Sequence, residues 1–427
     1  MPASAPTTVR RTSRVLYIAY ASPVPSRLGP ARRHYHVLDQ LARFYDVHFL
    51  CIGDGVEAEA FKRHFGDRVS GFTFVPRSTG RGRRRIRQLA RTMIGRCDFW
   101  PALEPRLREA CQRVVSAHAF DAIVLSSVLL RSLPLPEHLP LVADTHNVEF
   151  DVLRRTAAYA DRLLVRQYAR SQWPSTRREE RRCGEGVDLL LATSARDRQM
   201  FEGELALRRV AVLPNGIDLT EFVAATTAPQ PGTILFTGLM SYYPNQQAVR
   251  WFLNEVFPVI LKNRPDARLV VAGAAPPRWM TALARPEVEV TGLVPDIRPY
   301  LERAAVFIAP LMIGGGTRVK ILEALAMERP VVSTSIGAEG LELAHGASVL
   351  FADDPAAFAA RVVDVLQDAR LAARLGACGR QHVAARFDWD RIGEAARQLL
   401  ASRIGLEGRA GAARGLRPFR VADRVES

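Results

Sequence analysis

The chain has 427 residues, of which 48% are hydrophobic and 24% charged. This length exceeds what a single hydrophobic core usually serves, so we expect two domains of roughly 200 residues each, and the composition excludes a largely disordered chain. The formal net charge is +15, and residues 1–220 contain 35 Lys and Arg against 23 Asp and Glu. The basic excess therefore lies in the first half, above all in 81–91 and 154–182. It favours anionic partners such as nucleic acid, acidic lipid or phosphorylated substrates.

The cysteines and apolar runs predict a cytoplasmic protein. None of the five cysteines belongs to a CxxC pair or to a His-linked metal spacing, and such a scattered set is typical of reduced thiols. The first apolar run, Val15 to Ala21, is too short for a signal peptide. No run approaches the ~18 apolar residues that a spanning helix requires, so we expect no transmembrane segment.

Apolar runs alternate with helical stretches in the first half of the chain. A helix is predicted over 31–44, after the first strand. The predicted strands of this half are 15–21, 47–53, 120–127, 141–146, 187–194 and 210–216. Alternation of this kind is typical of a parallel α/β sheet.

The pattern restarts after a linker rich in Ala, Thr and Pro at 223–232. The predicted strands of this half are 233–238, 267–273, 288–292, 305–310 and 330–335. Two such halves imply a cleft lined by the loops at the strand C-termini. The predicted segments are a disordered leader (1–13), an N-terminal domain (14–222), a C-terminal domain (223–386), a last helix (387–402) and a disordered tail (403–427).

The strongest motif runs from Ile313 to Thr334. It opens with a loop of four small residues, namely Gly314, Gly315, Gly316 and Thr317. Glycines allow backbone N–H groups to approach an anion, and the following helix adds a favourable partial charge. Arg318 and Lys320 could neutralise a diphosphate, and Glu323 could accept hydrogen bonds from ribose hydroxyls. The alternative is a flexible turn with solvated charges, but positive charge early in a helix is unfavourable without a compensating anion.

A second motif, DTHNVEF, ends the strand predicted over 141–146. It contains His146, Asn147 and Glu149 at the sheet edge where ligands bind in such folds. The alternative is a purely structural histidine. Two weaker candidates for the cleft are Asn215, in a tight Asn-Gly turn, and Gly29, beside basic residues after the first strand; each is also explained by architecture alone.

The acidic pair Asp388 and Asp390 has the DxD spacing that often binds a divalent metal. It lies beyond the last predicted strand and directly before a helix. An N-cap explains it better there, so we predict no metal site.

Together these motifs resemble retaining glycosyltransferases of the GT-B fold, specifically glycosyltransferase family 4 (glycosyl transferases group 1). The resemblance extends from Val15 to about Leu400, and its most specific part is GGGTRVKILEALA. It implies an α/β protein with two Rossmann-like domains whose parallel sheets face a cleft. The N-terminal domain would present the acceptor, and the C-terminal helix would cross back to it.

The resemblance also implies roles for individual residues. Glu323 would bind the ribose, and the loop 314–317 the phosphates or the sugar of the donor. Val294 would meet the base, His146 would face the transferred sugar, and Gly238 would belong to the donor site. No metal or other cofactor is implied.

Two positions depart from the family pattern. A second glutamate normally lies eight residues before the one at Glu323, where this chain has Gly315. The usual lysine after the first strand of the C-terminal domain is replaced by Pro244 and Asn245. We expect Arg318 and Lys320 to stabilise the leaving diphosphate in its place.

The expected function is transfer of a sugar from a nucleotide-sugar donor to a glycan or lipid-linked acceptor, in cell-surface polysaccharide or glycoconjugate synthesis. The basic N-terminal half is expected to dock on the anionic cytoplasmic membrane surface. The alternatives are a GT-B-fold sugar-nucleotide epimerase, a catalytically inactive scaffold, and a basic nucleic-acid-binding protein. The last alternative lacks aromatic residues among its basic runs.

Overall fold

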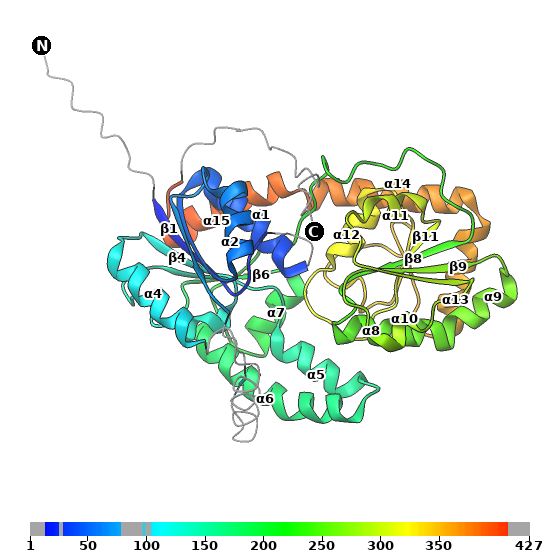
Figure 1. Cartoon of the computed structure of the whole chain (residues 1–427), viewed down its shortest axis with the longest axis horizontal. Coiled ribbons are helices and arrows are strands. Elements are labelled where there is room, and N and C mark those ends of the chain that lie inside the picture. The colour runs from blue at the N-terminus through cyan, green and yellow to red at the C-terminus, as the bar shows by residue number, and fades with distance from the viewer. Residues whose placement is uncertain (1–12, 25–28, 78–96, 99–103, 409–427) are drawn as a thin grey trace, which may run out of the picture.

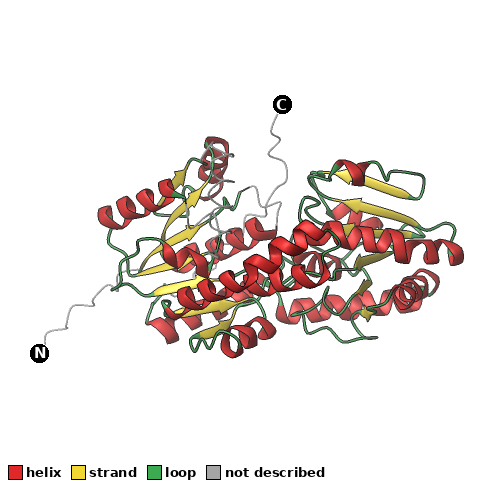
Figure 2. Ribbon diagram, turned by 90° about the horizontal axis from the view of Figure 1, so that it is seen from below, coloured by secondary structure: helices red, strands yellow, loops and turns green. Residues whose placement is uncertain are grey.

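The computed structural model describes residues 13–24, 29–77, 97–98 and 104–408. The basic run 81–91 and most of the predicted leader and tail lie outside these residues. The described chain forms two α/β domains side by side (Figure 1), and helices flank both sheets (Figure 2). The predicted fold class is confirmed.

The N-terminal domain is built on a seven-stranded sheet in the order β3-β2-β1-β4-β5-β6-β7, in which all neighbouring strands are parallel. The strands are β1 Arg14–Ala19, β2 Asp46–Ile52, β3 Gly71–Val75, β4 Ala122–Leu125, β5 Leu141–Asp144, β6 Leu189–Ala192 and β7 Val210–Val212. The sequence predicted all of them except β3. This edge strand is mostly half-buried, so it lacks the continuous apolar run of its neighbours.

Helices connect these strands and cover both faces of the sheet. They are α1 Gly29–Phe44, α2 Gly55–Phe65, α4 Pro105–Ala117, the 3₁₀ turn η2 Val128–Ser132, α5 Glu149–Tyr159, α6 Leu163–Glu185 and α7 Ala195–Gly203. Helices α5 and α6 form a hairpin that projects toward the C-terminal domain (Figure 1). Its tip contacts that domain, because Asp161 pairs with Arg250 at 2.8 Å.

The C-terminal domain repeats the plan with a six-stranded parallel sheet in the order β10-β9-β8-β11-β12-β13. Its strands are β8 Thr233–Thr237, β9 Arg268–Ala272, β10 Val288–Gly292, β11 Val306–Ala309, β12 Val331–Ser333 and β13 Leu350–Phe351. Its helices are α8 Tyr243–Trp251, the π-turn η3 Phe252–Val256, α9 Phe257–Asn263, α10 Arg278–Thr281, α11 Arg298–Arg303, α12 Val319–Ala326, α13 Pro355–Gln367 and α14 Ala369–Arg386.

The order of the strands in each sheet determines where the sequence motifs lie. In each sheet the chain starts at a central strand, moves to one side, and returns to the other side of that strand. The resulting switch points lie between β1 and β4 and between β8 and β11. Ligands bind at such points in doubly wound sheets, beyond the carboxyl ends of the strands. The glycine loop follows β11 and therefore lies beside one of them.

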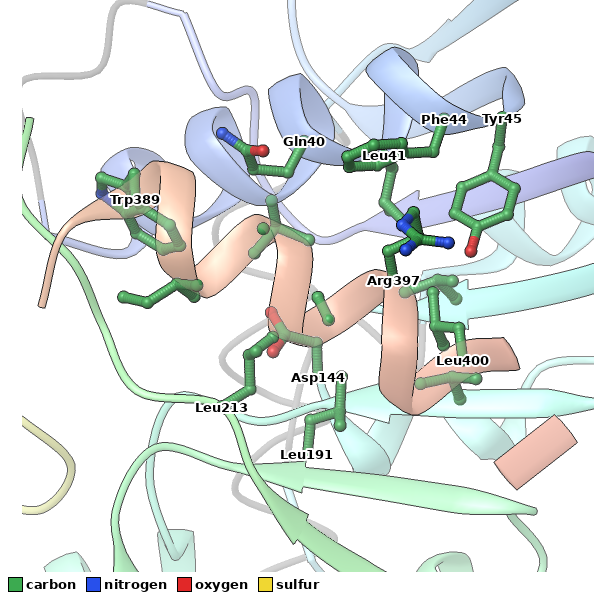
Figure 3. Close-up of a pocket in the computed structure, with 16 residues that line it drawn as sticks. Gln40, Leu41, Phe44, Tyr45, Asp144, Leu191, Leu213, Trp389, Arg397 and Leu400 are labelled. Carbon is green, nitrogen blue, oxygen red and sulfur yellow. The ribbon is translucent and has the colours of Figure 1, made fainter. Parts of the chain in front are cut away.

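The last helix, α15 Trp389–Ile404, packs against α1 of the N-terminal domain. Trp389 stacks on the ring of His36 at a centroid distance of 4.7 Å. Figure 3 shows the small pocket left between the two helices and the sheet. Its volume is about 30 Å³ and its walls are mostly aliphatic and aromatic side chains. That is room for about one water molecule, so the pocket is a packing defect under the helix, too small for a sugar nucleotide.

The predicted start of the disordered tail, residue 403, is too early. Helix α15 continues to Ile404, and Leu406 is buried in the same apolar cluster as Trp389. This apolar contact keeps the chain ordered beyond the predicted boundary.

The acidic pair before α15 has local partners. Asp388 accepts a hydrogen bond from the backbone N–H of Asp390 at 2.7 Å, as an N-cap does. Asp390 pairs with Arg43 of α1 at 2.7 Å. Both contacts favour the N-cap interpretation. Within the described ranges, no helix has the length and apolar character needed to cross a membrane.

Candidate functional site at the domain interface

The glycine loop of the C-terminal domain packs directly against the N-terminal domain. A Cβ atom at Gly316, whose φ is +63°, would lie 2.2 Å from the carbonyl oxygen of His146. At Gly315 it would lie 2.8 Å from a methyl group of Val152. Only glycine fits this approach, because a side chain at either position would push the two domains apart.

We expect Gly316→Ala to destabilise the protein more than Gly346→Ala. Both glycines have positive φ, so alanine costs about 1–2 kcal/mol of backbone strain at either site. Gly346 has open space around its Cα, whereas Gly316 faces His146. Calorimetry should therefore give a lower unfolding midpoint for Gly316→Ala. Equal midpoints would contradict the close packing of the loop.

Arg318 fixes the shape of this loop. Its guanidinium donates hydrogen bonds to the carbonyl oxygens of Gly315 and Gly316, and to that of Ile336 at 3.2 Å. The side chain is buried. The sequence predicted that Arg318 would neutralise a diphosphate; in the structure such a contact has to compete with three carbonyl groups.

Lys320 is better placed for that role. Its ammonium donates to the side chain of Asn245 at 2.9 Å and lies 4.2 Å from the ring centroid of Phe236, at the end of β8. Gly238 keeps this corner open, since a Cβ there would lie 2.9 Å from the Lys320 nitrogen. Lys320 thus reaches the segment after β8, where the family pattern has its usual lysine. Loss of solvent, with the nearby charge of Arg318, lowers the pKa of Lys320 to about 7. A bound diphosphate would restore its charge.

Glu323 forms an ion pair across the interface. Its carboxylate accepts from Arg32 of α1, and the Arg32 guanidinium lies 5.1 Å from the ring centroid of Phe222. Glu323 is 8% exposed. The residue predicted to bind ribose is therefore held by the opposite domain.

His146 belongs to a pair of histidines. Its Nε2 lies 2.9 Å from Nε2 of His34, a buried residue of α1, and both rings pack against Tyr20. Burial lowers the pKa of His34 to about 3, and burial together with His34 lowers the pKa of His146 well below its ordinary value. Both rings are therefore neutral near pH 7, so one Nε2 carries a hydrogen and donates it to the other.

A second set of contacts joins α1, β5 and the Asn-Gly turn. Arg33 pairs with Asp144 at the end of β5 and donates to Asn215 at 2.9 Å. Asn215 in turn donates to the carbonyl oxygen of Thr317 at 3.2 Å. Asn215 thus links its own domain to the glycine loop. Gly29 is the first residue of α1.

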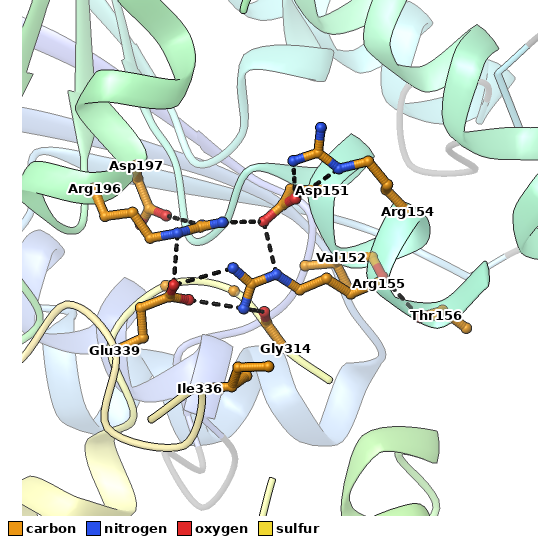
Figure 4. A network of polar contacts seen from close by, with 12 residues as sticks. Asp151, Val152, Arg154, Arg155, Thr156, Arg196, Asp197, Gly314, Ile336 and Glu339 are labelled. Atoms are coloured by element: carbon orange, nitrogen blue, oxygen red, sulfur yellow. Dashed lines mark hydrogen bonds and ion pairs between the residues drawn. The ribbon is translucent and has the colours of Figure 1, made fainter. Parts of the chain in front are cut away.

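A network of ion pairs surrounds the other side of the loop (Figure 4). Glu339, in the turn after β12, accepts from Arg155 at 2.8 Å and from Arg196 at 2.7 Å. Both arginines also contact Asp151, and Arg155 donates to the carbonyl oxygen of Gly314 at 3.3 Å. Burial alone would raise the pKa of Asp151, but the arginines hold it below its usual range. The network joins α5 and α7 to the C-terminal domain.

Asn147 and Glu149 also lie at this interface. The side-chain amide of Asn147 lies 2.9 Å from the carbonyl oxygen of Gly315. Glu149 opens α5, and its backbone N–H donates to the carboxylate of Glu180 at 2.9 Å. Val294, the remaining predicted residue, is half-buried in the loop after β10, at the outer edge of the C-terminal sheet.

The structure adds residues that the sequence did not suggest. Arg32 and His34 fall in a segment whose basic character was noted, but nothing in its spacing assigned them partners. Glu180 lies mid-helix in α6, and Glu339 in an irregular turn. Neither has a local signal, because their partners lie far away in the sequence.

Two family models match the chain in succession. The model described as Glycosyltransferase Family 4 matches residues 29–221, and the model described as Glycosyl transferases group 1 matches residues 231–368. Both halves of the chain are glycosyltransferase domains. The glycine loop, α12 and Lys320 lie in the second of these domains, and His146 and α1 lie in the first.

Curated relatives match parts of this glycosyltransferase. It is 30% identical over 140 residues to a 44.6 kDa protein from the cps region of Klebsiella pneumoniae, and this alignment covers 31% of this chain and 36% of that protein. It is 28% identical over 256 residues to the GDP-mannose-dependent monoacylated alpha-(1-6)-phosphatidylinositol monomannoside mannosyltransferase of Corynebacterium glutamicum, which is 54% of this chain and 67% of that protein. The alignments thus span between about a third and two thirds of these relatives.

Solved structures share the fold over nearly the whole chain. HepE of Anabaena, in complex with UDP and glucose, has a TM-score of 0.66 at 15% identity, covering 91% of this chain and 100% of that one. Sucrose-phosphate synthase of Thermosynechococcus elongatus has a TM-score of 0.68 at 16% identity, covering 92% and 99%. The architecture is therefore that of GT-B glycosyltransferases.

Proposed function

We propose that this protein is a retaining glycosyltransferase that moves a sugar from a nucleotide-sugar donor to a glycan or lipid-linked acceptor. The observation that carries the proposal is the arrangement of the glycine loop and α12. The glycine loop meets His146 of the other domain, and Glu323 of α12 pairs with Arg32 of that domain. Lys320 lies on the same helix and reaches Asn245 and Gly238 after β8.

The chemistry of these groups suits a nucleotide-sugar. Backbone N–H groups of the glycine loop and the start of α12 favour an anionic diphosphate, and Lys320 supplies a cation beside it. Glu323 accepts hydrogen bonds from ribose hydroxyls, and the neutral ring of His146 can exchange a hydrogen bond with the transferred sugar. As charge develops on the leaving diphosphate, Lys320 stabilises it without a separate reorganisation step.

A thermal-shift panel of UDP-, GDP-, ADP- and TDP-sugars tests this proposal. It should include UDP-glucose and GDP-mannose, because HepE has been solved with UDP-glucose and the Corynebacterium relative is named for GDP-mannose. A donor at one hundred times its Kd stabilises the folded state by about 2.7 kcal/mol. We expect at least one donor to raise the unfolding midpoint and to be consumed when acceptor is present. Consumption without acceptor, giving an isomeric sugar nucleotide, would favour the epimerase alternative.

We further propose that transfer needs no divalent metal. The acidic DxD pair serves as an N-cap and a partner of Arg43, and Lys320 provides positive charge at the diphosphate. Transfer rates should therefore be unchanged, within about twofold, after exhaustive treatment with EDTA. An absolute requirement for added Mg²⁺ or Mn²⁺ would contradict this.

We also propose that the start of α6 docks on an anionic membrane. Leu163 and Leu164 are 63% and 81% exposed, and Tyr168 one turn later is 44% exposed. Arg162, Arg166 and Arg170 flank this apolar strip. Exposed leucines beside arginines suit a leaflet with acidic headgroups, where each cation contributes about 1 kcal/mol.

Flotation with phosphatidylglycerol vesicles should recover the protein at low salt, and neutral vesicles should recover little. The double variant Leu163→Ser, Leu164→Ser should bind less, whereas Arg361→Ser, Arg374→Ser on the C-terminal domain should bind like wild type. Failure of the wild-type protein to float with acidic vesicles would favour a soluble acceptor.

A further inference from the structure

Glu149 has a carboxyl group at the domain interface whose partners differ from those of the neighbouring acidic residues. Three other acidic side chains of the site, Asp144, Asp151 and Glu323, are each paired with arginine. The contact made by the Glu149 carboxyl is 3.4 Å long and leads to the amide of Asn147. The side chain is only half-buried, so a ligand can reach it.

The orientation of the Asn147 amide determines which group donates the hydrogen bond between Asn147 and Glu149. One end of its amide lies 2.9 Å from the carbonyl oxygen of Gly315 and 3.0 Å from that of His146. Carbonyl oxygens only accept hydrogen bonds, so the NH₂ group must point toward them. The amide oxygen then faces Glu149, which can donate a hydrogen bond to it only when the Glu149 carboxyl carries a proton.

The surroundings of Glu149 agree with a protonated group. Loss of solvent raises the pKa of Glu149. Burial, together with Glu149 when it is ionised, raises the pKa of Glu180 to about 8, and the Glu180 carboxylate accepts two backbone N–H bonds at the start of α5. A carboxyl placed beside another acidic group without a cation is costly to ionise. It becomes favourable as an anion once hydroxyl donors contact it.

The Glu149 carboxyl lies close to residues that are proposed to bind the donor. Glu149 lies three residues after His146, and Asn147 connects it to Gly315 of the glycine loop. Burial, together with Glu149 when it is ionised, raises the pKa of Tyr242, in the loop after β8 of the opposite domain. Gly315 has no side chain, and Val152 and Asn147 fill the space beside it. At this point the polar side chains Asn147 and Glu149 therefore come from the N-terminal domain, and Gly315 contributes none.

On the basis of the proposed function, we infer that Glu149 is a specificity residue that accepts hydrogen bonds from hydroxyl groups of the transferred sugar. Sugar hydroxyls donate to the carboxylate while its proton is released to solvent, and Asn147 stays bound to the glycine loop. A site built to bind hydroxyl groups discriminates strongly against a sugar that lacks them.

Glu149→Gln separates this role from a structural one. The glutamine amide still donates to the Asn147 oxygen, so the unliganded contact is kept, but the anionic acceptor is lost. The measurement is calorimetric affinity for the nucleotide-sugar found in the donor panel and for the corresponding nucleoside diphosphate alone. Glu185→Gln, at an exposed ion pair with Arg181 on α6, is the matched control.

For Glu149→Gln we expect a loss of about tenfold or more in affinity for the nucleotide-sugar, the size of a lost charged hydrogen bond. Affinity for the nucleoside diphosphate should stay within about twofold, which also shows that the variant is folded. Unchanged affinity for both ligands, or an equal loss for both, would overturn the inference alone. A wild-type protein that binds neither ligand would overturn the proposed function as well.

Discussion

Glu323→Gln should weaken binding of the nucleotide-sugar by about tenfold to a hundredfold. The variant removes the negative charge that would accept hydrogen bonds from the ribose, and a charge-assisted bond contributes about 1.5–3 kcal/mol. Glu323 is 8% exposed in the middle of α12, so water would replace the contact poorly. Calorimetry with the donor and with the nucleoside diphosphate should show losses of similar size, because both ligands contain the ribose.

Glu323 also pairs with Arg32, so a control must separate the two contacts. Arg32→Gln breaks the ion pair and leaves the carboxylate in place. Donor affinity of this variant should remain within about threefold of wild type, since only the link between α1 and α12 is lost. If Glu323→Gln binds donor as wild type does, the assignment of α12 to the nucleotide is wrong.

His146→Ala should lower kcat by about a hundredfold, the scale seen when a single hydrogen bond to a developing charge is removed. The His146 imidazole belongs to the N-terminal domain and pairs with buried His34. We therefore expect it to act on the donor in the assembled site and not on binding of the nucleotide alone. Affinity for the nucleoside diphosphate should be unchanged within about twofold. Steady-state rates and calorimetry on the same preparation measure the two effects.

His138→Ala, which changes an exposed histidine of the same domain, is the matched control and should keep wild-type rates. A parallel loss of kcat and of nucleotide affinity in His146→Ala would instead make His146 a donor ligand or a structural residue.

The sequence predicted the strands and the positions of the site loops because both are local properties. Buried parallel strands are continuous apolar runs, and β1, β5, β8 and β11 each end at a loop whose residue types are unusual. Parallel strands bring those loops to one edge of each sheet, so the glycine loop and DTHNVEF could be assigned to a common site from the sequence. Strands β3 and β13 were missed, because β3 is half-exposed and β13 has only two residues.

The partners of the site residues could not be predicted, because they depend on how two domains dock. Arg32 and Glu323 are separated by 291 positions, and Arg155 and Glu339 by 184. The direction in which a side chain points could not be predicted from the sequence either. Arg318 lies two residues before Lys320 in the same motif, yet it turns back to the carbonyl groups of its own loop while Lys320 reaches Asn245. No spacing rule distinguishes these two outcomes.

The central claim is that the C-terminal domain binds the nucleotide-sugar donor through the glycine loop, α12 and the loop after β8. Hydrogen–deuterium exchange with and without saturating donor tests it most directly. We expect slower exchange at residues 238–246 and 313–323, and unchanged exchange in α4, which lies on the side of the N-terminal domain away from the C-terminal domain (Figure 1). Protection confined to the N-terminal domain, or no protection by any donor in the panel, would contradict the account.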